Sequence, residues 1–320
     1  MRSLIHTICA FLCVLIAVPL VFGSPVELAV GGRVGKRRPT YAIAHMVLDR
    51  RGLRDAIAHG ANSVEVDIAA YKEGWWADHD IRSKSWGDSL EVMFKAIAKE
   101  NKRIAFVWLD LKTPNMCSGK SCNKDVLDPS KCKSSQKCSM QSLQKLAQKY
   151  LQPAGVRILY GFYGAGATDS AGFNYIQGNL KDGEAVCLSG EVDKVLNVYK
   201  KKGSGVKPAQ RVMDYGYTEL HKGFGNCTED GHKTCAGLRN GAKARQEGLV
   251  RRVFGWTSQI GDGKRVASML DKAHVDGIIY GFGVTRYYHH KESELAARDI
   301  NRHVKKSLDR YMATGSDKPW

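Results

Sequence analysis

Beyond Val26, the 320-residue sequence has no apolar run long enough to cross a bilayer. It lacks a Gly-rich nucleotide fingerprint after its first predicted strand, which argues against a dinucleotide-binding fold. It also lacks a CxxC pair with supporting histidines, which argues against a structural zinc site. Acidic residues are few relative to basic ones, 32 against 49, and the formal net charge of +17 suggests an anionic partner without identifying it. The composition, 43% hydrophobic and 25% charged, is that of a globular protein.

The N-terminus has the pattern of a secretory signal: one positive residue, a short apolar run and small residues after it. We therefore expect residues 1–23 to be a signal peptide and the protein to be secreted and extracellular. A membrane anchor is the alternative, because Ser3–Val26 contains no Lys, Arg, Asp or Glu. Residues 24–38 would then be an N-terminal segment. Its basic end, Lys36–Arg38, is either a processing site, which would make the segment a propeptide, or an exposed charge run.

Seven of the nine cysteines would remain after removal of that signal. Four of them fall within a Lys/Ser-rich stretch of 22 residues, and two more lie close together. In a secreted protein this spacing indicates loops held by disulfide bonds. The seventh, Cys187, lies in an apolar run and is expected to be a buried, inert thiol. The other six are Cys117, Cys122, Cys132, Cys138, Cys227 and Cys235.

From Tyr41 onward, short strand-like runs alternate with amphipathic helical patterns. Eight strand–helix units in one domain predict an α/β fold, a single (β/α)8 TIM barrel over residues 39–320. A doubly wound open sheet is the structural alternative. The helix pattern after Tyr163 is the weakest. The predicted strands are Tyr41–Met46, Ser63–Ala69, Arg103–Lys112, Arg157–Tyr163, Glu184–Ser189, Arg211–Tyr215, Val250–Thr257 and Gly277–Phe282.

Carboxylates concentrate near the C-terminal ends of the second and third predicted strands, where barrel enzymes carry their chemistry. Glu65 and Asp67 alternate on the second strand, so their side chains face the same way. Asp110 and Lys112 alternate in the same manner on the third. Three carboxylates with no histidine among them suit a hard cation such as Mg²⁺. A plainer alternative is that a carboxylate of the second strand simply pairs with Lys112.

Two histidines flank this cluster: His45 ends the first predicted strand, and His79 lies in the loop after the second. They could act as acid and base on opposite sides of a reacting phosphorus, while Lys112 holds a phosphoryl oxygen. Alternatively, His45 is a hydrogen-bonded core histidine. Buried charges at strand ends are costly, so the six residues together favour a functional site.

Five short motifs and a tail occur in order along the chain. The motifs are Arg37-Arg38-Pro39, Ala44-His45-Met46-Val47, Gly60-Ala61-Asn62-Ser63, Glu65-Val66-Asp67 and Asp110-Leu111-Lys112, and the tail is Ala313–Trp320. Together they resemble the sphingomyelinase D / dermonecrotic-toxin family of phospholipase D enzymes, whose C-terminal tail plugs the base of the barrel. The stretch Gly74–His79 looks more like the secreted fungal branch than the spider toxins.

The resemblance implies a Mg²⁺-dependent attack on choline-bearing phospholipids, including sphingomyelin and lysophospholipids. The substrate's own hydroxyl would attack phosphorus, releasing choline and leaving a cyclic phosphate. We further expect a monomer that touches the membrane surface and binds no nucleic acid. Because such a site handles lipid phosphate, the excess positive charge is interpreted as attraction to anionic membrane surfaces, which salt would weaken. The residues that correspond are the metal ligands Glu65, Asp67 and Asp110, the catalytic pair His45 and His79, and the phosphate-contacting Lys112.

The loop after the second predicted strand departs from the spider pattern. The stretch Tyr71–Gly87 contains no cysteine and instead carries Trp75, Trp76 and Trp86. These three side chains are either an aromatic lip that enters the interfacial region of a membrane or ordinary loop packing.

Two further departures concern the headgroup. Cys187 and Gln259 stand where the spider enzymes have acidic residues. Asp214 on the sixth strand could still supply a negative charge for a cationic headgroup, and Trp256 could offer a cation–π face. We therefore expect both residues to bind substrate.

Two other functions fit parts of the sequence. A glycerophosphodiester phosphodiesterase shares the barrel and a pair like His79-Asp80, but it usually has Arg-Gly where this chain has Met46-Val47, and it lacks the tail. A non-enzymatic basic protein that binds an anionic polymer or membrane would account for the charge. No nucleic-acid-binding module is visible, however, and the basic pairs are scattered.

Overall fold

The computed structural model describes residues 37–81, 87–114, 127, 131–164, 166–229 and 233–320. The expected signal peptide and nearly all of the 24–38 segment lie outside these residues, as do Trp86, Cys117 and Cys122. The first strand begins at Arg38, so the end of that segment is part of the folded domain. Among the described helices, none is long and apolar enough to cross a membrane.

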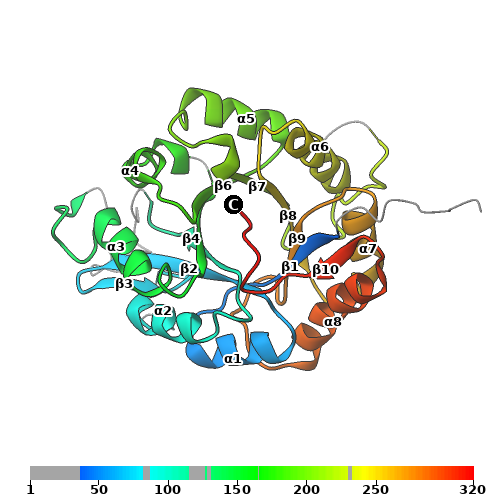
Figure 1. Ribbon diagram of the computed structural model, residues 1–320, viewed down its shortest axis with the longest axis horizontal. Coiled ribbons are helices and arrows are strands. Elements are labelled where there is room, and N and C mark those ends of the chain that lie inside the picture. Colours follow the sequence, from blue (N-terminus) through cyan, green and yellow to red (C-terminus); the bar gives the residue numbers. More distant parts are fainter. Residues whose placement is uncertain (1–36, 82–86, 115–126, 128–130, 165, 230–232) are drawn as a thin grey trace, which may run out of the picture. The chain divides into compact units, whose positions relative to one another are not determined.

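Eight parallel strands form a closed barrel (Figure 1). They are β1 (Arg38–Ala44), β2 (Ser63–Tyr71), β4 (Phe106–Leu111), β5 (Arg157–Phe162), β6 (Glu184–Ser189), β7 (Arg211–Gly216), β8 (Arg252–Ser258) and β9 (Gly277–Tyr280). Each pairs in parallel with the next, and the pairing of β9 with β1 closes the ring. The predicted (β/α)8 barrel is confirmed, and the open-sheet alternative is wrong.

Helices surround the strands on the outside of the ring (Figure 1). Those in the described residues are α1 (Arg50–Ala58), α2 (Leu90–Lys99), α3 (Met140–Tyr150), α4 (Ala171–Asn179), α5 (Val192–Lys201), α6 (Thr234–Gln246), α7 (Gly263–Asp271) and α8 (Lys291–Lys306). The weakly patterned helix after Tyr163 is α4. It begins where the Ser170 hydroxyl accepts a hydrogen bond from the Phe173 N–H, and it buries Phe173 and Ile176.

Two short strands lie outside the barrel order. β3 (Gly74–Ala77) pairs antiparallel with the end of β2, so the chain after Tyr71 forms a hairpin where a loop was expected. β10 (Arg310–Met312) pairs in parallel with the start of β1. The third barrel strand begins at Phe106 rather than Arg103, because the N–H of Arg103 bonds the carbonyl of Glu100 in a turn after α2.

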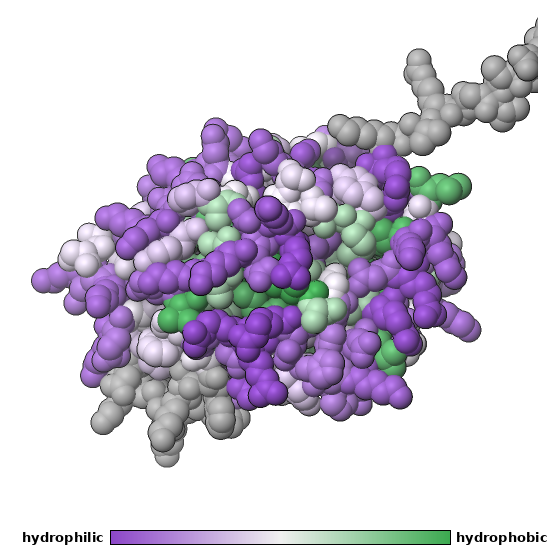
Figure 2. Space-filling view, turned by 60° about the horizontal axis from the view of Figure 1, so that its bottom comes forward, coloured by the Kyte–Doolittle hydropathy of each residue, from purple (hydrophilic) through white to green (hydrophobic). Residues whose placement is uncertain are grey.

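The side of the molecule that Figure 2 shows is mostly hydrophilic, with apolar residues visible in a strip between polar ones. The bottom of Figure 1, where α1 and α2 lie, is turned forward in this view. The groove between these helices is lined by apolar Leu53 and Val92 and by basic residues that include Arg54, Lys95 and Lys99. Part of the excess positive charge is thus carried on the outer faces of helices.

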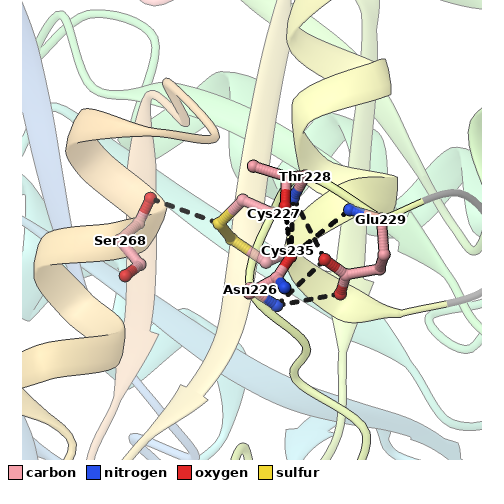
Figure 3. The surroundings of a disulfide bond; sticks show 6 residues. All are labelled: Asn226, Cys227, Thr228, Glu229, Cys235 and Ser268. Atoms are coloured by element: carbon pink, nitrogen blue, oxygen red, sulfur yellow. Dashed lines mark hydrogen bonds between the residues drawn. A yellow bond between two sulfur atoms is a disulfide. The ribbon is translucent and has the colours of Figure 1, made fainter.

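Two disulfide bonds confirm the expected stapled loops, Cys132–Cys138 and Cys227–Cys235. The second joins the loop after β7 to the first turn of α6 (Figure 3). In the same loop the Glu229 carboxylate accepts hydrogen bonds from the N–H groups of Asn226 and Thr228. Cys187 is buried and unpaired, as expected.

The C-terminal tail closes the base of the barrel, and in Figure 1 the red chain end runs to the centre of the ring. The ring centroids of Trp320 and Phe106 lie 5.1 Å apart, and Trp320 Nε1 donates a 2.9 Å hydrogen bond to the carbonyl of Gly183. Arg252 Nε donates to the carbonyl of Pro319 at 2.8 Å. Phe106 begins β4 and Gly183 directly precedes β6, so the plug lies at the N-terminal end of the barrel.

Replacing Trp320 with alanine should therefore destabilise the fold without touching the opposite end of the barrel. We expect the free energy of unfolding to fall by roughly 2–3 kcal/mol, below the value for a fully buried tryptophan because Trp320 is partly exposed. Urea denaturation checks this result. Leu308→Ala is the control, since Leu308 is 90% exposed near the same end of the barrel. Equal stability of the two variants would show that the tail does not hold the base.

Candidate active site

The predicted site residues meet in a cavity of about 160 Å³ at the C-terminal end of the barrel. Seven of the eight line it, namely His45, Glu65, His79, Asp110, Lys112, Asp214 and Trp256. The eighth, Asp67, is 1% exposed and contacts Lys112 from behind the cavity wall. Residues spaced over more than 200 positions in the sequence thus form one site.

The three carboxylates form a tight group because of strand register. Asp67 on β2 lies opposite Asp110 on β4 in the parallel ladder, and Glu65 lies two residues before Asp67 on the same face. One oxygen from each lies within 4.8 Å of the others. Both β2 carboxylates are buried, and Asp110 is half-buried.

Lys112 lies between two of these carboxylates. Its Nζ is 2.7 Å from Asp67 Oδ1 and 2.6 Å from Asp110 Oδ2. Burial and the neighbouring carboxylates raise the pKa of Glu65 well above its usual range. Burial also acts on Asp67, but the Lys112 ammonium holds the pKa of Asp67 below its usual value. The plain pairing with Lys112 therefore exists, yet one ammonium faces three carboxylates.

The remaining oxygens fit a hard divalent cation. Asp67 Oδ2 and Asp110 Oδ1 are buried and have no hydrogen-bond partner among the described residues. Glu65 Oε2 accepts a 2.6 Å hydrogen bond from the N–H of Met46. Carboxylate oxygens at this separation, without nitrogen or sulfur ligands, are the donor set that such cations prefer. Glu65, Asp67 and Asp110 thus form a candidate metal site.

His45 follows β1 and is half-buried in the wall of the cavity. Its Nδ1 lies 2.6 Å from the carbonyl oxygen of Phe282. A carbonyl only accepts, so Nδ1 carries the proton and Nε2 is the acceptor of the neutral ring. Burial lowers the pKa of His45, although Asp67 opposes this effect, and the neutral form is favoured. The next residue, Met46, has a φ of 53°, and its N–H donates to Glu65 Oε2. We had not identified this role of Met46 from the sequence.

The β2–β3 hairpin brings His79 to the site. The chain returns along β2, and the N–H of Asp78 bonds the carbonyl of Asp67 at 2.9 Å. The Asp78 carboxylate accepts from the Tyr71 hydroxyl and is buried. His79 Nδ1 lies 3.0 Å from Asp80 Oδ1, which orients the ring. The sequence predicts the histidine, whereas the hairpin that positions it carries no strand signal of its own.

The same hairpin rules out the aromatic-lip alternative for Trp75. Its side chain is 4% exposed, and its Nε1 donates a 3.1 Å hydrogen bond to the carbonyl of Ser139. Trp76 is partly buried and packs against Ala69 and Tyr71. Packing is therefore the correct interpretation for Trp75, whereas Trp76, on the opposite face of the strand, is half-buried and fits either interpretation.

Asp214 and Trp256 are in direct contact, as neighbours on β7 and β8. Trp256 Nε1 and the Ser189 hydroxyl each donate a 2.6 Å hydrogen bond to Asp214 Oδ1. Cys187 Sγ lies 3.2 Å from Asp214 Oδ2. Burial raises the pKa of Asp214 to about 6 even though these donors act against it. The cavity therefore has a buried carboxylate beside an aromatic ring.

Gln259 does not line this cavity. Its side-chain amide donates to the carbonyl of Thr218 in the loop after β7. The residue that replaces an acid of the spider enzymes thus joins two loops at the mouth of the barrel.

Other residues that line the cavity were not predicted from the sequence. Trp108 lies two residues before Asp110 on the same inward face of β4, a signal that strand alternation already contained. Gly161 is required by this indole, because a Cβ there would lie 2.3 Å from Trp108 Nε1. Tyr163 follows β5 and stacks edge-on against Trp256, with ring centroids 5.8 Å apart. No sequence pattern marked Tyr163.

The closed barrel, with carboxylates, a lysine and two histidines at its C-terminal end, has the arrangement of a (β/α)8-barrel enzyme. The family model described as Sphingomyelinase D/Phospholipase D matches residues 35–320, and the chain belongs to that family. The resemblance seen in the motifs is thereby confirmed.

Relatives include two proteins that bear the name sphingomyelinase D. One, from Ajellomyces capsulatus, is 76% identical over 320 residues, and the other, from Paracoccidioides brasiliensis, is 63% identical over 327 residues; each alignment covers 100% of both chains. Both come from fungi, in agreement with the fungal character of Gly74–His79. Among solved structures, a glycerophosphodiester phosphodiesterase from Agrobacterium tumefaciens is similar with a TM-score of 0.42 and 12% identity, covering 81% of this chain and 98% of the other.

Proposed function

We propose that this protein is a secreted, Mg²⁺-dependent sphingomyelinase D that cleaves the phosphate–choline bond of sphingomyelin and lysophospholipids. The observation that carries the proposal is the single cavity shared by His45, His79, Lys112 and the carboxylate cluster. Two relatives named sphingomyelinase D support the same substrate class, because they are 76% and 63% identical to this chain over its whole length.

The residues suggest separate roles for the two histidines. His45 Nε2, the unprotonated nitrogen, would take the proton of the substrate hydroxyl as its oxygen forms a bond to phosphorus. His79, oriented by Asp80, would give a proton to the choline oxygen as the old phosphorus–oxygen bond breaks. One histidine gains a proton and the other loses one, and the lipid keeps a cyclic phosphate.

The reaction also requires that the negative charge on the phosphoryl oxygens be stabilised. Mg²⁺, held by Glu65, Asp67 and Asp110, would stabilise the negative charge that grows on phosphorus-bound oxygen. Lys112 lines the cavity and would contact another phosphoryl oxygen as a point charge. Its pairing with Asp67 and Asp110 holds the ammonium in place for that contact.

The choline cation would bind at Asp214 and Trp256, and this role predicts a pH dependence. The pKa of Asp214 is raised to about 6, so the carboxyl is charged above that pH and neutral below it. The KM for a choline substrate should rise as pH falls through about 6. Asp214→Asn should raise the KM on the order of tenfold at pH 7.5 and remove this change with pH.

Steady-state kinetics from pH 5 to 8 test this prediction, with Asp182→Asn, an exposed aspartate, as control. Since the folded-state pKa of Asp214 is raised, its charged form opposes folding above about pH 6. Asp214→Asn should therefore be at least as stable as the parent at neutral pH, which separates binding from folding. A KM that keeps its pH dependence in the variant would contradict the assignment.

Phosphorus NMR tests the proposed function as a whole, because it reports substrate and product together. Sphingomyelin, lysophosphatidylcholine and glycerophosphocholine are each incubated with the protein and Mg²⁺, or with a chelator. We expect the first two to be converted to a cyclic phosphate, only when Mg²⁺ is present. Turnover of glycerophosphocholine alone would instead identify a glycerophosphodiester phosphodiesterase.

A further inference from the structure

Exposed large apolar side chains are unevenly distributed over the residues that the structure describes. Five of the seven follow C-terminal ends of barrel strands, and two lie near the opposite end. The five are Tyr163 after β5, Tyr217 after β7, Ile260 after β8, and Val284 and Tyr288 after β9; the two are Leu249 before β8 and Leu308 before β10. The apolar exposure is thus concentrated at the end that carries the site.

Three of the strand-end loops are joined at a junction. The Gln259 amide of the loop after β8 donates to the carbonyl of Thr218 after β7. Gly283 of the loop after β9 packs on both, since a Cβ there would lie 2.8 Å from the Thr218 oxygen and 2.9 Å from Gln259 Nε2. The loops therefore hold one another in place.

Each residue of this junction has an exposed apolar neighbour in the chain. These are Tyr217, Ile260 and Val284, which are 45%, 49% and 82% exposed, and we call the three the apolar rim. Thr218 and Gly283 themselves line the active-site cavity. The apolar rim consequently borders the mouth of that cavity.

Apolar surface continues from the apolar rim toward the site. A recess of about 390 Å³ lies beside the active-site cavity and shares Tyr163 and Trp256 with it. Tyr217 of the rim lines this recess together with Leu188 and Val195. A lipid chain entering at the rim would meet apolar side chains on its way to the site.

Three basic residues in or beside these loops are paired with carboxylates. Lys222 lies 2.7 Å from Glu219 after β7, and Arg265 lies 2.7 Å from Asp262 after β8. Arg286, after β9, lies 3.4 Å from a carboxylate oxygen of Asp49. These pairs offset the local positive charge, although the chain as a whole carries +17. A rim of this kind suits a zwitterionic surface better than an anionic one.

We infer that the apolar rim inserts into the interface of a zwitterionic phospholipid bilayer and so places the mouth of the site against choline headgroups. The inference rests on the proposed function, because a bilayer lipid must reach this cavity. Attraction of the whole basic surface to anionic lipid is the competing mode, and it would weaken with salt.

The test compares the parent with a rim variant, Val284→Ser plus Ile260→Ser, and a control, Leu249→Ser plus Leu308→Ser. Partition onto vesicles of phosphatidylcholine and sphingomyelin is measured in chelator at 0.05 and 0.5 M salt, so that no lipid is consumed. We expect the rim variant to partition at least about tenfold more weakly and the control to match the parent. Salt should change the parent's partition little.

Turnover is then measured in Mg²⁺ on sphingomyelin vesicles and on a short-chain lysophosphatidylcholine below its micelle concentration. The rim variant should lose vesicle turnover in proportion to partition and keep turnover of the dissolved lipid. A rim variant that partitions as well as the parent, or a parent that is released from these vesicles by 0.5 M salt, would overturn the inference. A parent that converts neither lipid would refute the proposed function, while the partition data still decide the rim.

Discussion

Replacing His45 with alanine should lower the turnover of sphingomyelin in Mg²⁺ by about two to four orders of magnitude, the usual contribution of one general acid or base. The Nδ1 of half-buried His45 is held by the Phe282 carbonyl, so Nε2 is the nitrogen left to accept a proton. No other described histidine that lines the cavity can replace it except His79, which the Asp80 carboxylate orients. His79→Ala should therefore cause a loss of similar size.

The control is His303→Ala, because His303 bonds Asp271 on the helical surface, away from the cavity. Circular dichroism and vesicle partition should be unchanged in all three variants, which separates chemistry from folding and membrane contact. If either cavity variant turned over sphingomyelin as fast as the parent, the assignment of that histidine would be wrong.

Lys112→Met should abolish turnover and also lower the free energy of unfolding by roughly 3–5 kcal/mol at pH 7 in chelator. The ammonium contacts Asp67 and Asp110, and methionine would leave their buried charges together with Glu65 and no cation. Added Mg²⁺ should recover part of the stability, because a bound cation would offset the same charges.

The pKa of Asp67 determines how the free energy of unfolding should change with pH. Lys112 holds its folded-state pKa below the usual value, so this pair stabilises the fold above about pH 4, and the contribution is lost as pH falls through the depressed pKa. In Lys112→Met the contribution is absent, so its deficit in stability should be largest at neutral pH and shrink in acid. Urea denaturation at pH 7 and well below pH 4, where Asp67 is protonated, measures the difference.

Lys95→Met serves as control, since Lys95 pairs with Glu91 on the exposed face of α2. It should change stability little at either pH. A deficit for Lys112→Met no larger than that of the control would mean that the carboxylates do not depend on this lysine.

Much of the barrel and the centre of its site could be predicted from local patterns. Alternation along a strand has a period of two residues, so Glu65 and Asp67 had to share a face, as did Asp110 and Lys112. Closure of eight parallel strands then brings their C-terminal ends together. The same alternation contained Trp108, which we had not identified.

Other features depend on pairing between segments that the local pattern does not encode. Residues after Tyr71 had the composition of a loop, yet β3 pairs with β2, buries Trp75 and returns His79 to Asp67. Likewise, the pKa of Asp214 depends on its burial among donors from β6 and β8.

The sequence by itself determined the barrel, the carboxylate cluster, the lysine, both histidines and the family, because strand alternation and short motifs are properties of neighbouring residues. Only the tertiary structure decided how His79 reaches the site, that Trp75 forms no lip, and that an apolar rim borders the cavity. The rim consists of single residues on three loops, each unremarkable in its own segment. Their proximity arises from the contact of Gly283 with Thr218 and Gln259, which exists only after the barrel has closed.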